Sequence, residues 1–170
     1  MSKFVKINQN PFGKIIGDCT IRAVSLGTNT PYEEVCKMFG KKFKKGLGLD
    51  DKGVDPVHLY RFAEKYKTLK SVWFDERYIK WAYQNKPYEY KFKERTLKEF
   101  CDKITGQYIL CLRPEVNFDA DILREWSRGQ LHTIYCNASK GEYYDNEWER
   151  GGDPGDMKIF WVYRVIKKSK

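Results

Sequence analysis

One cysteine stands in a sequence context that suits nucleophilic chemistry. Cys19 follows Gly17 and Asp18, a turn residue and a good helix N-cap, and it precedes a stretch that is compatible with a short helix. A sulfur at the positive end of a helix is stabilised as the thiolate, which is the nucleophilic form of the side chain. The alternative interpretation is a small hydrophobic residue at the start of a packed helix. Both interpretations fit the position.

A histidine that could exchange a proton with this thiol lies far downstream. His132 opens the apolar run 133–136, which is typical of a strand and would hold the imidazole rigidly. Asp145 and Asn146 follow after an expected hairpin turn. Thiol hydrolases use this order of cysteine, histidine, and then acid or amide. The alternatives are a hydrogen-bonded polar histidine and an ordinary turn at 145–146.

The length of the hairpin loop decides which side chain orients the histidine. With a five-residue loop at 137–141, His132 faces Asn146. With a four-residue loop, His132 shares its face with Asp145 and Glu147. Either an amide or a carboxylate could accept from the imidazole N–H and fix its tautomer. The sequence leaves this choice open.

Acyl transfer also needs a donor for the oxyanion. The backbone N–H of Cys19 could supply one, and Gln9 or Asn10 could add a side-chain N–H. Asn10 before Pro11 is equally well explained as a turn former.

Helical patterns come first along the chain and strand patterns later, which indicates an α+β fold rather than alternating βαβ units. Caps are expected from Asp18, Thr30, Asp55 and Thr96. A short edge strand is expected near 88–92, and a short helix over 120–126. Helices are expected at 19–26 (closed by Gly27), 31–39, 56–66 and 97–104, and strands within 1–17 and at 71–74, 107–113, 131–136, 142–145 and 159–166.

Composition indicates a single domain over residues 1–170. Apolar residues make up 41% and aromatic residues 16%, enough for one sizeable core. No apolar run is long enough to span a membrane, and the N-terminus lacks the apolar segment of a secretory signal. The five cysteines form no CxxC pair and there are two histidines, so reduced thiols and no metal site are expected.

The formal charge of +9 fits a nucleic acid, an acidic protein or a membrane surface as partner. Lysines are dispersed except in a basic, glycine-rich segment at 41–54, which is interpreted as a loop. The segment 73–92 interleaves aromatic residues with lysines, a pattern that can stack on single-stranded bases but is more often core. The charge alone is explained by a basic, solvated surface.

Taken together, the short motifs resemble those of bacteriophage-encoded papain-like cysteine peptidase-fold proteins. The likeness covers most of the chain in order. The matching motifs are Asn10-Pro11, Gly13-Lys14, Gly17-Asp18-Cys19, Arg22-Ala23, the run at 30–35, Gly106–Ile109, Gly129–His132 and Gly141–Asp145. The resemblance implies N-terminal helices, with the nucleophile at a helix N-terminus, packed on a C-terminal antiparallel sheet. It further implies Cys19 as nucleophile, His132 as base and Asp145 as orienter.

The expected function is that of a thiol hydrolase or acyl transferase acting on a peptide, amide or isopeptide bond without a cofactor. Its substrate would be a host or virion protein or peptide. The expected location is the host cytoplasm or the virion. The alternative is a papain-fold structural or host-interaction protein without turnover, which could bind nucleic acid through its basic surface. Arg22 is expected to form a clamp with Asp18, and His58 to lie outside the site.

Overall fold

The fold was analysed in a computed structural model. It describes residues 1–13, 17–41, 43–44, 48–49, 54–76, 89–114, 131–146 and 151–167. The helices are α1 (Cys19–Thr28), α2 (Tyr32–Met38), α3 (Pro56–Tyr66) and α4 (Leu97–Lys103), with short 3-10 turns η1 (Tyr90–Phe92) and η3 (Ala138–Lys140). The strands are β1 (Lys3–Lys6), β2 (Phe43–Lys44), β3 (Gly48–Leu49), β4 (Leu69–Phe74), β5 (Gln107–Arg113), β6 (His132–Asn137), β7 (Glu142–Asp145) and β8 (Lys158–Val165).

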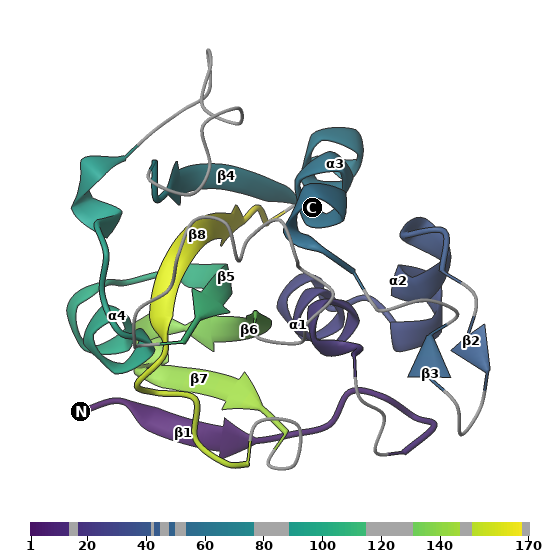
Figure 1. Ribbon diagram of the computed structural model, residues 1–170, viewed down its shortest axis with the longest axis horizontal. Coiled ribbons are helices and arrows are strands. Elements are labelled where there is room, and N and C mark those ends of the chain that lie inside the picture. The colour runs from purple at the N-terminus through teal and green to yellow at the C-terminus, as the bar shows by residue number, and fades with distance from the viewer. Residues whose placement is uncertain are drawn as a thin grey trace.

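The protein has an α+β fold in which N-terminal helices pack on a six-stranded mixed sheet. The strand order is β1-β7-β6-β5-β8-β4. Figure 1 shows α1, α2 and α3 on one side of the molecule and α4 on the other, with the sheet between them. The expected α+β class is therefore confirmed.

The expectation of a C-terminal antiparallel sheet was wrong in two respects. The N-terminal strand β1 joins the sheet at one edge and runs parallel to β7, with Lys3 opposite Glu142. The opposite edge is β4, from the middle of the chain. The expectation missed this because strand pairing between distant segments leaves no signal in local periodicity.

Helix α1 lies directly against the centre of the sheet. A Cβ on Gly27 would lie 2.8 Å from Cδ1 of Ile109 and 3.0 Å from Cδ2 of Tyr135, so a larger residue here would have to displace these side chains. Gly27 was expected to end the helix, but the helix continues to Thr28. Asn29 ends it in the left-handed conformation with φ of 53°.

Two expected helix caps are confirmed. The Asp55 carboxylate accepts the His58 N–H, and the Thr96 hydroxyl accepts the Glu99 N–H. The cap expected from Thr30 was wrong, because Pro31 is the N-cap residue of α2. Asp18 occupies the expected N-cap position of α1, but its carboxylate makes no cap bond and instead bonds to the side chains described below.

The hairpin between β6 and β7 resolves the register that the sequence left open. Asn137 pairs with Glu142, so the loop contains the four residues 138–141. Gly141 closes the loop with a φ of +66°, which favours glycine. Of the two registers considered, this is the one that places Asp145 on the same face as His132.

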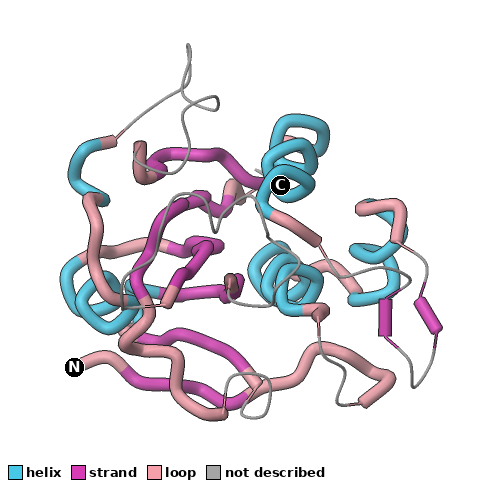
Figure 2. The backbone as a smooth tube through the Cα atoms, viewed as in Figure 1, coloured by secondary structure: helices cyan, strands magenta, loops and turns pink. Residues whose placement is uncertain are grey.

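The tube in Figure 2 shows helices on both sides of the sheet. One apolar cluster joins α1, α2 and α3 to the sheet, and a second joins α4 to it. Trp73, Phe74 and Phe92 are at most 5% exposed, so these aromatic side chains belong to the core. In the described parts of the chain, no helix has both the length and the apolar character that crossing a membrane requires.

Three further expectations concern loops. The prediction of an edge strand near 88–92 was wrong for residues 90–92. These residues form the turn η1, in which the Phe92 N–H donates to the Glu89 carbonyl. The basic segment 41–54 contains a small β2–β3 ladder, and most of its other residues lie outside the described ones. The expected helix at 120–126 also lies outside them.

Candidate functional site

Cys19 lies at the first position of α1, as the sequence predicts. Its side chain is partly exposed, whereas Cys36, Cys101, Cys111 and Cys136 are buried. Helix α1 has ten residues, so its first-turn N–H groups carry the partial positive charge that stabilises a thiolate. Cys19 is therefore the cysteine of this chain placed to react with a molecule from solvent.

His132 and Asp145 form a buried pair beside this helix end. Nε2 of His132 lies 2.6 Å from Oδ2 of Asp145, and the two residues are 1% and 2% exposed. They come from the start of β6 and the end of β7. The hairpin register therefore brings together the histidine and carboxylate that the sequence predicts.

The two oxygens of the Asp145 carboxylate have different partners. Oδ2 faces the imidazole, while Oδ1 accepts from Nη1 of Arg22 at 3.1 Å and from the backbone N–H of Asn146 at 2.9 Å. Burial would raise the pKa of Asp145, but the bond to His132 and the charges of His132 and Arg22 outweigh burial and lower it. The carboxylate is thus ionised at neutral pH, so the imidazole Nε2–H is the donor in the short bond.

The other imidazole nitrogen is available to the cysteine. Nδ1 of His132 is buried, and no atom of the described residues meets it with the distance and angle of a hydrogen bond. Burial alone would lower the pKa of His132, but its hydrogen bond to Asp145 and its interactions with Cys19 raise the pKa to about 9. The Cys19 thiol is therefore an electrostatic neighbour of the ring, and the imidazole is protonated at neutral pH.

A hydroxyl pair fixes the helix to the strand next to both residues. Oγ1 of Thr20 donates to Oγ1 of Thr133 at 3.2 Å and lies 3.3 Å from the carbonyl oxygen of Val54. Thr20 follows Cys19 in the chain, and Thr133 follows His132. This contact therefore sets the position of the sulfur relative to the ring. Sequence reasoning missed it, because nothing local to either threonine indicates the other.

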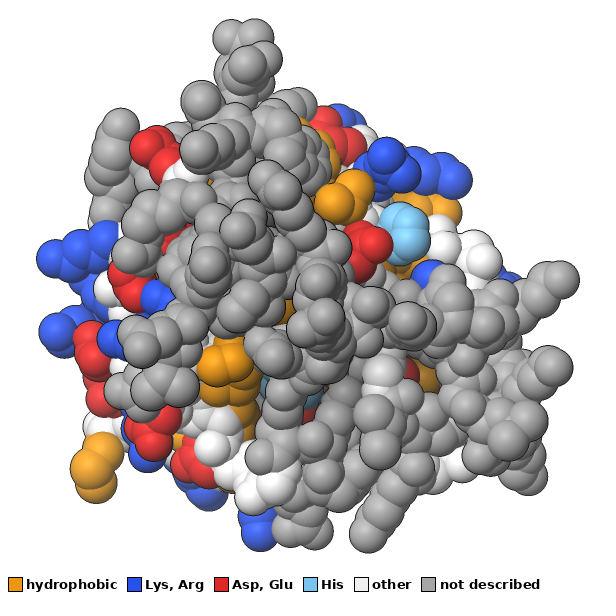
Figure 3. Space-filling view, in the orientation of Figure 1, with side chains coloured by type: hydrophobic (Ala, Val, Ile, Leu, Met, Phe, Trp, Pro, Cys, Tyr) orange, Lys and Arg blue, Asp and Glu red, His pale blue; other side chains and the backbone are white. Residues whose placement is uncertain are grey.

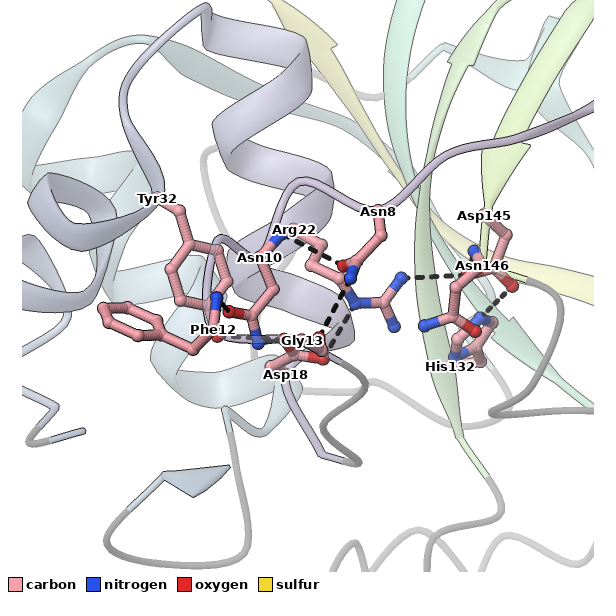
Figure 4. Close-up of polar contacts among 10 residues, drawn as sticks. All are labelled: Asn8, Asn10, Phe12, Gly13, Asp18, Arg22, Tyr32, His132, Asp145 and Asn146. Atoms are coloured by element: carbon pink, nitrogen blue, oxygen red, sulfur yellow. Dashed lines mark hydrogen bonds and ion pairs between the residues drawn. The ribbon is translucent and has the colours of Figure 1, made fainter. Parts of the chain in front are cut away.

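Asp18 is the centre of a second group of buried polar side chains. Its Oδ2 accepts from Nδ2 of Asn10 and from the hydroxyl of Tyr32, both at 2.9 Å, and its Oδ1 accepts from Nε of Arg22 at 2.8 Å. Burial and the nearby carboxylate raise the pKa of Tyr32, so its hydroxyl remains a donor. The expected Arg22–Asp18 clamp is confirmed. Figure 4 shows this group joined through Arg22 to Asp145 and His132.

The two side chains considered as oxyanion donors, Asn10 and Gln9, have different surroundings. Asn10 uses its side-chain amide to bond Asp18 and its Oδ1 to accept the Phe12 N–H, so these contacts hold the loop before α1. Gln9 instead lines a small hollow together with Cys19. Asn146 contributes its backbone N–H to Asp145, and the side chain that contacts His132 is the Asp145 carboxylate.

The hollow at Cys19 is formed by both polar and apolar side chains. Its polar wall includes Arg22, Thr133 and Asp145. Its apolar wall consists of Ile7, Ala23, Leu26, Ile134 and Tyr144. Cys19 therefore lies beside both hydrogen-bonding and apolar side chains.

No cluster of three metal-ligating side chains occurs in the part of the chain that the structure describes. Comparisons of the chain with protein-family models, with curated proteins and with solved structures found no match. The geometry of the site is therefore the basis for assigning a function.

Proposed function

We propose that this protein is a papain-like thiol hydrolase or acyl transferase that acts on a peptide, amide or isopeptide bond through Cys19, His132 and Asp145. The observation that carries the proposal is the 2.6 Å contact between Nε2 of His132 and Oδ2 of Asp145. This contact leaves Nδ1 as the ring nitrogen that can exchange a proton with the thiol of Cys19. The order of the three residues in the chain is the one that the resemblance to phage papain-like proteins implies.

In the first half of the reaction, the Cys19 thiolate attacks the carbonyl carbon of the substrate. A C–S bond forms and the carbonyl π electrons move to the oxygen, which the backbone N–H of Cys19 can stabilise. The tetrahedral intermediate collapses, the C–N bond breaks, and Nδ1–H of His132 gives its proton to the leaving amine. The product is a thioester on Cys19.

In the second half, neutral His132 accepts a proton from water or from an acceptor amine as it attacks the thioester. The C–S bond breaks, the acyl group leaves as an acid or a new amide, and the thiolate and imidazolium are restored. Asp145 remains ionised throughout and keeps Nε2 protonated. Its lowered pKa supports this role.

The arrangement of α1 and the sheet supports assignment of the protein to the papain-like class. A helix that begins at the nucleophile packs on a sheet that supplies the histidine and the acid. The partly exposed sulfur beside Gln9 also suits a thiol hydrolase better than a structural cysteine. Gln9 is the side chain best placed among the two candidates to assist at the oxyanion.

Acyl transfer from p-nitrophenyl acetate tests this function without knowledge of the natural substrate. The wild-type protein should release p-nitrophenolate in a burst and carry an acetyl group on Cys19, detected by mass spectrometry. Cys19→Ala and His132→Ala should each abolish the burst. His58→Ala is the matched control and should retain it, because His58 lies on α3 with an exposed side chain. A burst that persists in Cys19→Ala would refute the proposal.

The net charge of +9 favours one other function, a papain-fold phage structural or host-interaction protein that binds nucleic acid without turnover. On the face in Figure 3, however, described Lys and Arg side chains are interspersed with Asp and Glu. The buried Trp73, Phe74 and Phe92 cannot stack on bases. Binding of single-stranded DNA that weakens steeply with salt would support this second function, and no binding at low salt would exclude it.

A further inference from the structure

Arg22 connects two carboxylates from distant parts of the chain. Its Nε lies 2.8 Å from Oδ1 of Asp18, and its Nη1 lies 3.1 Å from Oδ1 of Asp145. Arg22 is 5% exposed, and the two acids are 0% and 2% exposed. Ion pairs at this depth are not weakened by water as surface pairs are, and each bond has a fixed direction because the guanidinium is planar.

The acid that holds Arg22 is itself held on its other oxygen. Asn10 and Tyr32 both donate to Oδ2 of Asp18, which leaves Oδ1 for Arg22. Asp18 immediately precedes α1, and Arg22 lies four residues later, one turn into the helix. The loop before α1 and the helix α2 therefore restrict the plane of the Asp18 carboxylate, and the guanidinium follows it.

Arg22 in turn restricts the carboxylate that faces the histidine. Rotation about the Cβ–Cγ bond of an aspartate is broad, and either oxygen could face a donor. In Asp145, Oδ1 is occupied by Arg22 and the Asn146 N–H, so Oδ2 is the oxygen that meets Nε2 of His132. Figure 4 shows the guanidinium between the two carboxylates.

We infer that Arg22, anchored by Asp18, is a positioning residue that orients Asp145 and, through it, the imidazole of His132. Arg22 shares the wall of the hollow with Cys19, and its bonds to Asp18 and Asp145 are the contacts through which it would act on the histidine. This inference depends on the proposed function for its catalytic meaning, although the orientation of His132 can be measured without any reaction.

The deciding variant is Arg22→Lys, which keeps the positive charge. A lysine ammonium cannot bond both carboxylates with the fixed directions of a guanidinium, so the orientation of Asp145 should be lost. We expect the rate of Cys19 alkylation by iodoacetamide to fall on the order of tenfold to a hundredfold. We also expect the downfield proton NMR signal of the His132 Nε2–H to broaden or move upfield.

Arg164→Lys is the matched control. Arg164 makes a two-fold ion pair with Glu89, at 2.9 and 3.0 Å, on β8 and away from the site. This variant also replaces a guanidinium that bonds carboxylate oxygens, although Arg164 bonds a single, partly exposed acid, and it should leave both the alkylation rate and the His132 signal at their wild-type values. A general effect of weakening the fold would move the two variants alike.

The outcomes separate this inference from the proposed function. If Arg22→Lys retains the wild-type signal and rate, the inference is overturned, whatever the protein catalyses. If the signal changes while wild-type alkylation does not depend on His132, Arg22 positions the pair and the proposed function fails. Should Arg22→Lys not fold, Asp18→Asn removes the anchor charge and is expected to change both readouts in the same direction. Wild-type values for both readouts in Asp18→Asn would then overturn the inference.

Discussion

The raised pKa of His132 predicts that stability falls as the pH rises from about 6 to about 9.5. Its pKa is 6.5 in an unfolded chain and about 9 in the folded protein. The folded state therefore binds the proton more tightly than the unfolded state does. The resulting stabilisation is fully present below about pH 6.5 and is lost as the pH rises through about 9.

The size of the effect follows from the pKa difference. Each pKa unit corresponds to about 1.4 kcal/mol, so the rise from 6.5 to about 9 corresponds to a stabilisation on the order of 3 kcal/mol. His132 is 1% exposed, so solvent screening does not reduce this value appreciably. Nearly all of it should be lost over the stated range, which is a large part of the stability of a domain of this size.

Urea unfolding at a series of pH values measures the effect, with His132→Gln as the reference. Other groups also titrate in this range, notably thiols that ionise when the chain unfolds. Cys36 is one of them, because burial raises the pKa of its thiol to about 11 in the folded state. The contribution of Cys36 is common to both proteins, so the difference between the two curves reports His132 together with its interaction with Cys19.

We expect the wild-type protein to lose its advantage over His132→Gln in free energy of unfolding, by about 3 kcal/mol, as the pH rises from about 6 to about 9.5. Parallel curves over that range would contradict this prediction, since they would mean that folding does not change the proton affinity of His132. His132 would then not be held as an imidazolium beside Cys19 at neutral pH.

Three other changes test the supports of the site. Asp145→Asn should lower the pKa of His132 from about 9, because the carboxylate charge is lost, and an NMR titration that still gives about 9 would contradict this. Thr133→Val should cost about 1 kcal/mol of stability and slow Cys19 alkylation, because the bond from Thr20 is lost; an unchanged alkylation rate would show that this bond does not set the site. Gly27→Ala should cost about 1–3 kcal/mol in urea unfolding through its contact with Ile109, and a neutral effect would mean that the Ile109 and Tyr135 side chains move aside without cost.

Local sequence signals were enough to predict much of the site. The Gly-Asp-Cys context placed the sulfur at the start of α1, and the apolar run after His132 identified β6. The hairpin could be predicted only as two registers, because loop length is not fixed by residue type. The four-residue loop then determined that Asp145 faces the histidine.

Features that depend on distant pairing were not predictable in this way. The parallel pairing of β1 with β7 joins segments at opposite ends of the chain, and no local pattern indicates it. Asp18 was expected to cap α1, since aspartate is common at that position. Three side-chain donors, two of them from outside α1, bind its carboxylate instead. Tertiary contacts thus override the local preference, and they do so at the candidate site.

The most direct test of the account is the pH dependence of Cys19 alkylation by iodoacetamide. His132 is an imidazolium below about pH 9, so a cation lies beside the sulfur between about pH 6 and about pH 9, and the wild-type rate should exceed that of His132→Gln throughout this range. The excess should disappear as the pH rises above about 9, because the imidazolium then loses its proton. Identical pH profiles in the two proteins would contradict the claim that Cys19 and His132 act as a pair.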